Sequence, residues 1–139
     1  MPKPPTIADL RWQHDLVFEA VSGTQTIIID GDSREGPSPV QTLAFSVAGC
    51  MSVDVAHMLT KGRHALHAFR SHLVADRAQE DPHRFLRVTL HCVVEGDVPP
   101  EAVDRAIALS REKYCSVWHS MRQDIEFHVT WMPGAREPL

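Results

Sequence analysis

Three cysteines, Cys50, Cys92 and Cys115, are the residues of this sequence whose side chains could perform redox chemistry. Their odd number and wide spacing exclude a secreted disulfide framework, and no C-x-x-C motif indicates a zinc or thioredoxin site. In a reducing compartment, cysteines without a structural bridge are either core residues or reactive thiols. The functional question is therefore which of the three is which.

Cys92 has the sequence environment of a core residue. It alternates at period two with Leu90 and Val94, which predicts the apolar face of a strand. A free cysteine on such a face most often acts as a small hydrophobic side chain.

Cys50 lies in the middle of a polar row on an otherwise apolar helix. The row is Thr42, Ser46, Cys50, Asp54, His57 and Lys61. Spacing alone fits a solvated edge with an incidental cysteine as well as a reactive site. Cys50 is about 16 Å from the expected helix start at Pro39, beyond the reach of the helix dipole. Activation would need a cation or donor from another segment, and Asp54 would oppose thiolate formation unless it is paired.

Cys115 has two basic neighbours at helical spacing, Arg111 four residues before it and His119 four residues after it. If the segment is one continuous helix, both side chains share the face of the thiol and should lower its pKa. The alternative is a buried cysteine on an amphipathic helix.

The nine histidines do not predict a metal centre. His64 and His67 would point to opposite faces of a strand, and a third ligand at a defined spacing is missing. The sequence also lacks the Gly-rich phosphate and dinucleotide motifs, the G-x-S-x-G nucleophile motif and H-E-x-x-H. We therefore expect no metal and no cofactor.

The hydrophobic pattern predicts an α+β fold in the order ββ-α-ββ-α(α)-β, with a mostly antiparallel sheet. The expected strands cover residues 11–21, 24–30, 66–78, 85–95 and 125–131. Ser38 and Pro39 predict the start of a long helix that ends at Lys61 before Gly62. A second helix should begin at Pro99-Pro100 and continue, with a break, to Arg122. We expect a single domain, residues 1–139, with an ordered core of about 7–132.

The composition narrows the class of protein. The chain has 139 residues, of which 43% are hydrophobic and 23% charged, as in ordinary globular proteins. A net charge of −4 predicts no binding to nucleic acid or to an anionic membrane. No run of about 18 consecutive apolar residues predicts a membrane span, and the N-terminus does not resemble a signal peptide. We expect a cytoplasmic protein.

The long helix predicts an assembly. Residues 39–61 are apolar on most faces, and a single small sheet can cover only one of them. We therefore expect an obligate homodimer with a large apolar interface.

Two segments carry a resemblance to a known family. Residues 36–43 with Ala48-Gly49-Cys50-Met51-Ser52-Val53-Asp54-Val55 resemble the start of the central helix of the OsmC/Ohr family. Residues 101–117, including Glu112-Lys113-Tyr114-Cys115-Ser116-Val117, resemble its second cysteine segment. The similarity covers about residues 10–132 and is greatest to the shorter, less characterised OsmC-like branch.

The resemblance implies an intertwined homodimer with two central helices between sheets. It implies thiol-dependent reduction of organic hydroperoxides, with Cys50 as the peroxidatic cysteine, Cys115 as the resolving one and a cellular dithiol as reductant. Members with this activity carry a Glu directly after the helix Pro, paired with an activating Arg, and this chain has Val40 there. Arg34, in the preceding loop, is the candidate activator, with Arg11 as a weaker alternative.

Two functional classes follow from these features. The leading hypothesis is a peroxidase of the oxidative stress response, and the apolar helix favours an organic peroxide over hydrogen peroxide as substrate. The other is a non-catalytic redox sensor or small-ligand-binding dimer, which the replacement of the Glu by Val40 favours.

Overall fold

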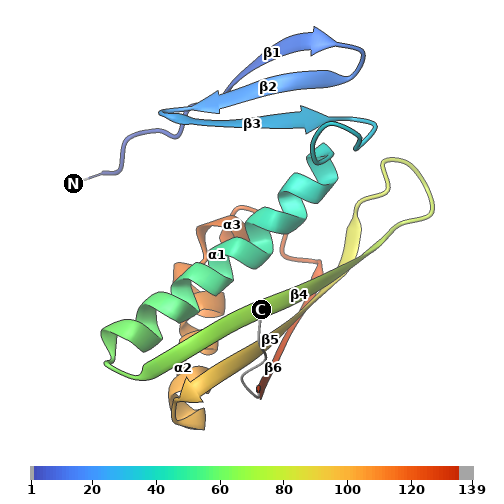
Figure 1. Ribbon diagram of the computed structural model, residues 1–139. Helices are drawn as coiled ribbons and strands as arrows, with labels where there is room; N and C mark the ends of the chain where they lie inside the picture. The colour runs from blue at the N-terminus through green and yellow to red at the C-terminus, as the bar shows by residue number, and fades with distance from the viewer. Residues whose placement is uncertain (1, 135–139) are drawn as a thin grey trace. The chain divides into compact units, whose positions relative to one another are not determined.

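The computed structural model describes residues 2–134 and has an α+β fold, as predicted (Figure 1). Its elements are β1 (Asp9–His14), β2 (Val17–Ser22), β3 (Gln25–Asp30), α1 (Pro39–Lys61), β4 (Ala65–Arg77), β5 (Phe85–Asp97), α2 (Pro100–Leu109), a π-helical turn (Ser110–Tyr114), α3 (Ser116–His119) and β6 (Glu126–Pro133). The chain forms two compact units, Met1–Phe45 and Ser46–Leu139. The single-domain organisation stays a prediction.

The N-terminal unit contains an antiparallel sheet in the order β1-β2-β3. The predicted hairpin is confirmed: Ser22 pairs with Gln25, and Gly23 adopts a φ of 58° in the turn. The prediction of one strand over residues 11–21 is wrong, because the chain turns back after His14. Asp15 has a φ of 46°, and its carbonyl accepts a hydrogen bond from the Trp12 indole at 2.8 Å. Aspartate tolerates this left-handed conformation, which periodicity does not reveal.

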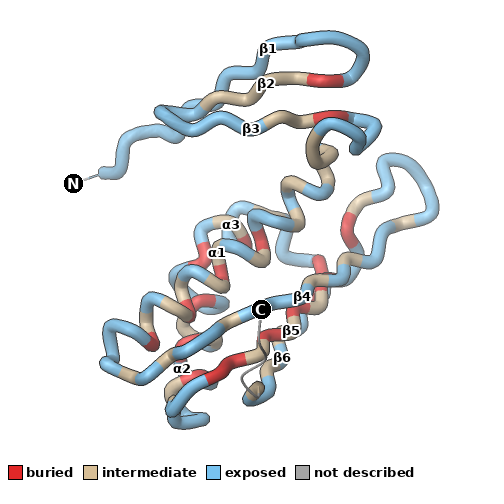
Figure 2. The backbone as a smooth tube through the Cα atoms, in the orientation of Figure 1, coloured by how far each residue is buried: buried red, intermediate tan, exposed pale blue. Residues whose placement is uncertain are grey.

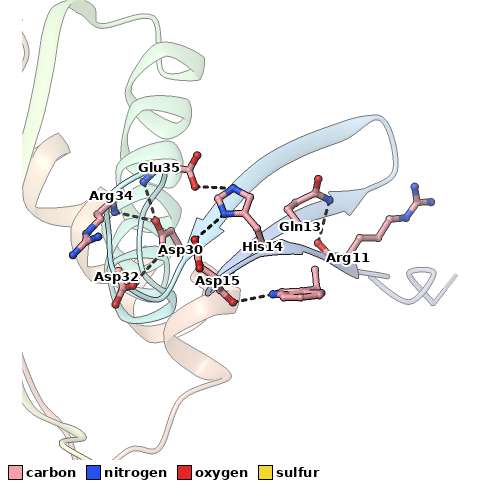
Figure 3. Close-up of polar contacts among 9 residues, drawn as sticks. Arg11, Gln13, His14, Asp15, Asp30, Asp32, Arg34 and Glu35 are labelled. Carbon is pink, nitrogen blue, oxygen red and sulfur yellow. Dashed lines mark hydrogen bonds and ion pairs between the residues drawn. The ribbon is translucent and has the colours of Figure 1, made fainter.

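The loop between β3 and α1 is organised around Asp30. This buried carboxylate accepts hydrogen bonds from the main-chain N–H groups of Asp32, Arg34 and Glu35 (Figure 3). These bonds stabilise the charged form, so they hold the pKa of Asp30 below its usual value. The loop thus has a fixed turn that leads directly into α1.

The start of α1 has the side-chain cap that the sequence predicts at Ser38. The Ser38 hydroxyl accepts a hydrogen bond from the Gln41 N–H at 3.1 Å, and the Gln41 side chain accepts one from the Ser38 N–H at 2.9 Å. This reciprocal arrangement is a capping box, which satisfies two donors at the helix start. The predicted end is also confirmed, since α1 stops at Lys61 before Gly62.

Within this one chain, α1 buries a single row of side chains. The row is Val47, Met51, Val55 and Leu59, at spacings of four residues. Other apolar residues of the helix are exposed, among them Leu43, Phe45 and Val53. The prediction that α1 is buried on most faces is therefore not fulfilled by one chain alone.

By length and composition, α1 could also cross a membrane. The expectation that the sequence holds no such segment relied on consecutive apolar residues. The mean hydropathy of an 18-residue window of α1 is nonetheless high enough for a membrane span, despite the interspersed polar side chains. Core helices of soluble proteins can reach the same value.

The C-terminal unit is a two-layer structure of helices on the sheet β4-β5-β6. The β4–β5 pair is antiparallel and the β5–β6 pair is parallel. Residues Val88, Leu90, Cys92 and Val94 of β5 form its buried face, visible as red segments in Figure 2. Helices contact this face through the Ser52–Ser71 hydroxyl pair and through the Trp131 indole, which donates to Asp104. The core of the unit lies between these two layers.

Candidate redox site

The C-terminal unit brings two of the three cysteines together. The Sγ atoms of Cys50 and Cys115 and a carboxylate oxygen of Asp54 all lie within 4.8 Å of one another. Cys50 and Asp54 come from successive turns of α1, and Cys115 comes from the segment between the π-helical turn and α3. The two cysteines that the resemblance pairs are therefore close together in the structure.

Cys115 reaches this position because the helix that carries it is interrupted. After α2 ends at Leu109, the turn at Ser110–Tyr114 widens to π geometry, and Cys115 is extended, with φ −72° and ψ 94°. It then caps α3, where its sulfur accepts a hydrogen bond from the Trp118 N–H at 3.5 Å. A π turn of this kind often marks a functional site.

The interruption overturns the prediction that Arg111 and His119 flank the thiol. The Arg111 guanidinium lies over the Phe127 ring, 5.4 Å from its centroid. The Nε2 atom of His119 forms a hydrogen bond with the main-chain carbonyl of Arg111 at 3.0 Å. Both basic side chains therefore have partners other than Cys115.

The surroundings of Cys115 raise its pKa to about 11, against the predicted lowering. Burial is the largest cause, because it disfavours the thiolate. The Trp118 N–H acts in the opposite direction, and the nearby Cys50 and Asp54 raise the value further. In the reduced protein, Cys115 is a protonated thiol at neutral pH.

Asp54 is held by a residue that the sequence did not single out as functional. The fully buried hydroxyl of Ser110 donates to the Asp54 carboxylate at 2.8 Å. A serine within an apolar helical run was the one sequence feature that could have indicated a buried polar contact. Its partner could not be inferred, because it lies 56 positions away in sequence. The sequence-based expectation that Asp54 faces the same side as Cys50 is confirmed.

Cys92 is a core residue, as predicted. It has no exposed surface, and burial alone raises its pKa to about 11. Among residues 2–134, the cluster of potential ligand atoms around the thiols contains Cys50, Asp54 and Cys115, and neither Cys92 nor a histidine belongs to it.

The two candidate activators belong to the N-terminal unit. Arg34 lies in the loop before α1, where its main-chain N–H donates to Asp30, and Arg11 lies on the exposed strand β1 (Figure 3). The activating role of Arg34 remains a prediction, as does that of Arg11.

Comparison with known proteins gives the family of this chain. Residues 30–130 match the model of the family described as OsmC-like protein. Protein YhfA of Escherichia coli K12 is 40% identical over 114 residues, which cover 79% of this chain and 84% of YhfA. This chain therefore belongs to the OsmC-like protein family.

Solved structures share the fold over nearly the whole chain. A hypothetical protein from Aquifex aeolicus has a TM-score of 0.88 at 24% identity, covering 97% of this chain and 100% of that one. An organic hydroperoxide resistance protein OsmC from Legionella pneumophila has a TM-score of 0.68 at 14% identity, covering 94% and 98%. Family and site together indicate a redox or peroxide-related function.

Proposed function

We propose that this protein is a thiol-dependent peroxidase that reduces organic hydroperoxides with Cys50 and Cys115. The observation that carries the proposal is the approach of the two Sγ atoms to within 4.8 Å. Their exposures support distinct roles. Cys50 is partly exposed and open to a substrate, whereas Cys115 is buried and within reach of Cys50.

The reaction has three steps. The Cys50 thiolate attacks the distal oxygen of the hydroperoxide, the O–O bond breaks, and the alkoxide takes a proton and leaves as an alcohol. The resulting sulfenic acid condenses with the Cys115 thiol, which releases water and forms a disulfide. A cellular dithiol then reduces this disulfide by thiol exchange, and both cysteines regain their reduced form.

An organic substrate and a cationic activator complete the proposed mechanism. The α1 surface near Cys50 includes the exposed side chain of Val53, and burying an alkyl chain against apolar surface favours organic peroxides. Arg34 is our candidate for stabilising the Cys50 thiolate, since a cation close to a thiol favours its charged form.

We further propose that the active form is a cytoplasmic homodimer. Each unit leaves apolar side chains exposed: Leu10, Trp12 and Ile27 on the N-terminal sheet and Val53 on α1. A three-stranded sheet with so few buried residues needs a partner surface to be stable. Light scattering at micromolar concentration should give twice the mass of the chain, and a monomeric mass would refute the dimer.

Steady-state turnover tests the peroxidase directly. The reduced protein should consume an alkyl hydroperoxide such as tert-butyl hydroperoxide in the presence of a dithiol, in proportion to enzyme concentration. The matched control is Cys50→Ser, which keeps the side-chain size and removes the nucleophile. Wild-type consumption no faster than that of the control would contradict the proposal.

The second candidate function is a slow redox sensor without turnover. The carboxylate of Asp54 favours it, because its negative charge raises the pKa of Cys115 and so opposes formation of that thiolate. Under this alternative, one equivalent of peroxide would still oxidise the cysteines, but added dithiol would not sustain consumption.

A further inference from the structure

The cluster of Cys50, Asp54 and Cys115 has the composition of a metal site as well as that of a redox pair. It offers two sulfur ligands and one carboxylate oxygen within 4.8 Å of one another. A tetrahedral Zn²⁺ with bonds of about 2.3 Å to sulfur separates two sulfur ligands by roughly 3.8 Å. The three atoms therefore need only small side-chain movements to bind one ion.

We propose that the reduced protein binds one Zn²⁺ through Cys50, Cys115 and Asp54. The fourth position of the tetrahedron would be open to water, since the described residues contribute three ligands to the cluster. Two sulfurs and one oxygen suit the borderline-soft Zn²⁺ better than Mg²⁺ or Ca²⁺, which prefer oxygen ligands.

Two hydrogen bonds orient the ligands from outside the cluster. The buried Ser110 hydroxyl donates to the Asp54 carboxylate, and the Trp118 N–H donates to the Cys115 sulfur. Outer-shell donors of this kind fix ligand direction in metal sites and contribute to affinity. The site thus holds its ligands in place without the metal.

The charge balance of the cluster also favours a cation. The Asp54 carboxylate lies within 4.8 Å of both sulfur atoms and places a negative charge beside them. A bound divalent cation would balance this charge and stabilise thiolate ligands.

The expectation of no metal came from histidine spacing, which this site does not involve. The ligands come from positions 50, 54 and 115, and only the fold brings them together. The site requires reduced thiols but no peroxidase turnover, so it does not rest on the proposed function. A Cys50–Cys115 disulfide would remove both sulfur ligands, so zinc and peroxide would compete for the same pair.

Co²⁺, used as a spectroscopic substitute for Zn²⁺, tests the proposal. Added to the reduced full-length protein, it should produce a sulfur-to-cobalt charge-transfer band and the visible bands of tetrahedral coordination, saturating at one equivalent. Zn²⁺ should displace it. Co²⁺ binding that saturates without a charge-transfer band, as binding to histidines would, would overturn the proposal.

Variants assign the ligands. Cys50→Ser should abolish the charge-transfer intensity or reduce it to that of one sulfur, and Cys92→Ala should leave it unchanged. Asp54→Asn should weaken binding at least about 10-fold, since even outer-shell partners contribute that much. Wild-type protein oxidised by one equivalent of peroxide provides a test without substitution. A band that survives oxidation, or that keeps its full intensity in Cys50→Ser, would refute the site.

Discussion

Cys92 and Cys115 are both fully buried and both have a pKa raised to about 11, yet their surroundings differ in kind. Cys92 lies on the inner face of β5, where burial alone accounts for its pKa. Cys115 lies at a break in a helix and contacts Cys50, Asp54 and the Trp118 N–H. Burial therefore does not distinguish the core thiol of Cys92 from that of Cys115, the proposed resolving cysteine. The polar and nucleophilic atoms around the Cys115 sulfur do distinguish them.

Hydroperoxide turnover should show the largest difference between the redox site and the core when each cysteine is replaced. We expect Cys50→Ser and Cys115→Ser to reduce hydroperoxide turnover with a dithiol by at least about 100-fold, because each loses a group that reacts. Cys92→Ala should retain activity within about twofold. Equal losses for Cys92→Ala and Cys115→Ser, with folding verified by circular dichroism, would erase the distinction.

The pH dependence of stability tests the structural role of Cys92. Its thiol stays protonated in the folded protein up to about pH 11, whereas the unfolded chain ionises above about pH 8.5. The folded state then binds more protons than the unfolded one, so stability must fall as pH rises through this window. Cys92→Ala should reduce that slope by up to about 1.4 kcal/mol per pH unit, measured by urea unfolding. An unchanged slope would contradict the burial effect.

A smaller effect should separate the two thiols by their response to Asp54. Asp54→Asn removes a negative charge that raises the pKa of Cys115 but does not act on that of Cys92. The measurement uses proteins that retain a single cysteine, either Cys115 or Cys92, and follows thiolate absorbance near 240 nm. Asp54→Asn should lower the pH at which Cys115 titrates, by less than about one unit. The Cys92 curve should not move. A shift in both would indicate a general change in packing.

The smallest expected effect concerns Arg34. If its guanidinium stabilises the Cys50 thiolate, Arg34→Ala should slow alkylation of Cys50 at pH 7 a few-fold, roughly the effect of a partly screened charge. Arg11→Ala, measured in the same assay, tests the other candidate activator. Identical alkylation rates in the parent and Arg34→Ala would exclude Arg34.

Local sequence patterns predicted most of the fold because the signals were local. The cap at Ser38, the stop at Gly62 and the alternation around Cys92 each depend on residues within one turn or strand. The turn at Asp15 was missed because one left-handed residue does not disturb the hydrophobic period.

The geometry of the site was harder to predict from the residues alone. Periodicity placed Arg111 and His119 beside Cys115, but the π turn redirects the thiol, and no residue type marks such a turn. The pairing of Cys50 with Cys115 came from family resemblance, since contacts between distant segments depend on packing. The Ser110–Asp54 bond was missed for the same reason.

Mapping the oxidised cysteines is the most direct test of the proposed Cys50–Cys115 disulfide. The reduced protein is treated with one equivalent of an organic hydroperoxide, free thiols are alkylated, and peptides are identified by mass spectrometry without reduction. We predict one peptide pair linked through Cys50 and Cys115, with Cys92 alkylated in full. A disulfide that includes Cys92, or an oxidised Cys50 that never forms a link to Cys115, would contradict it.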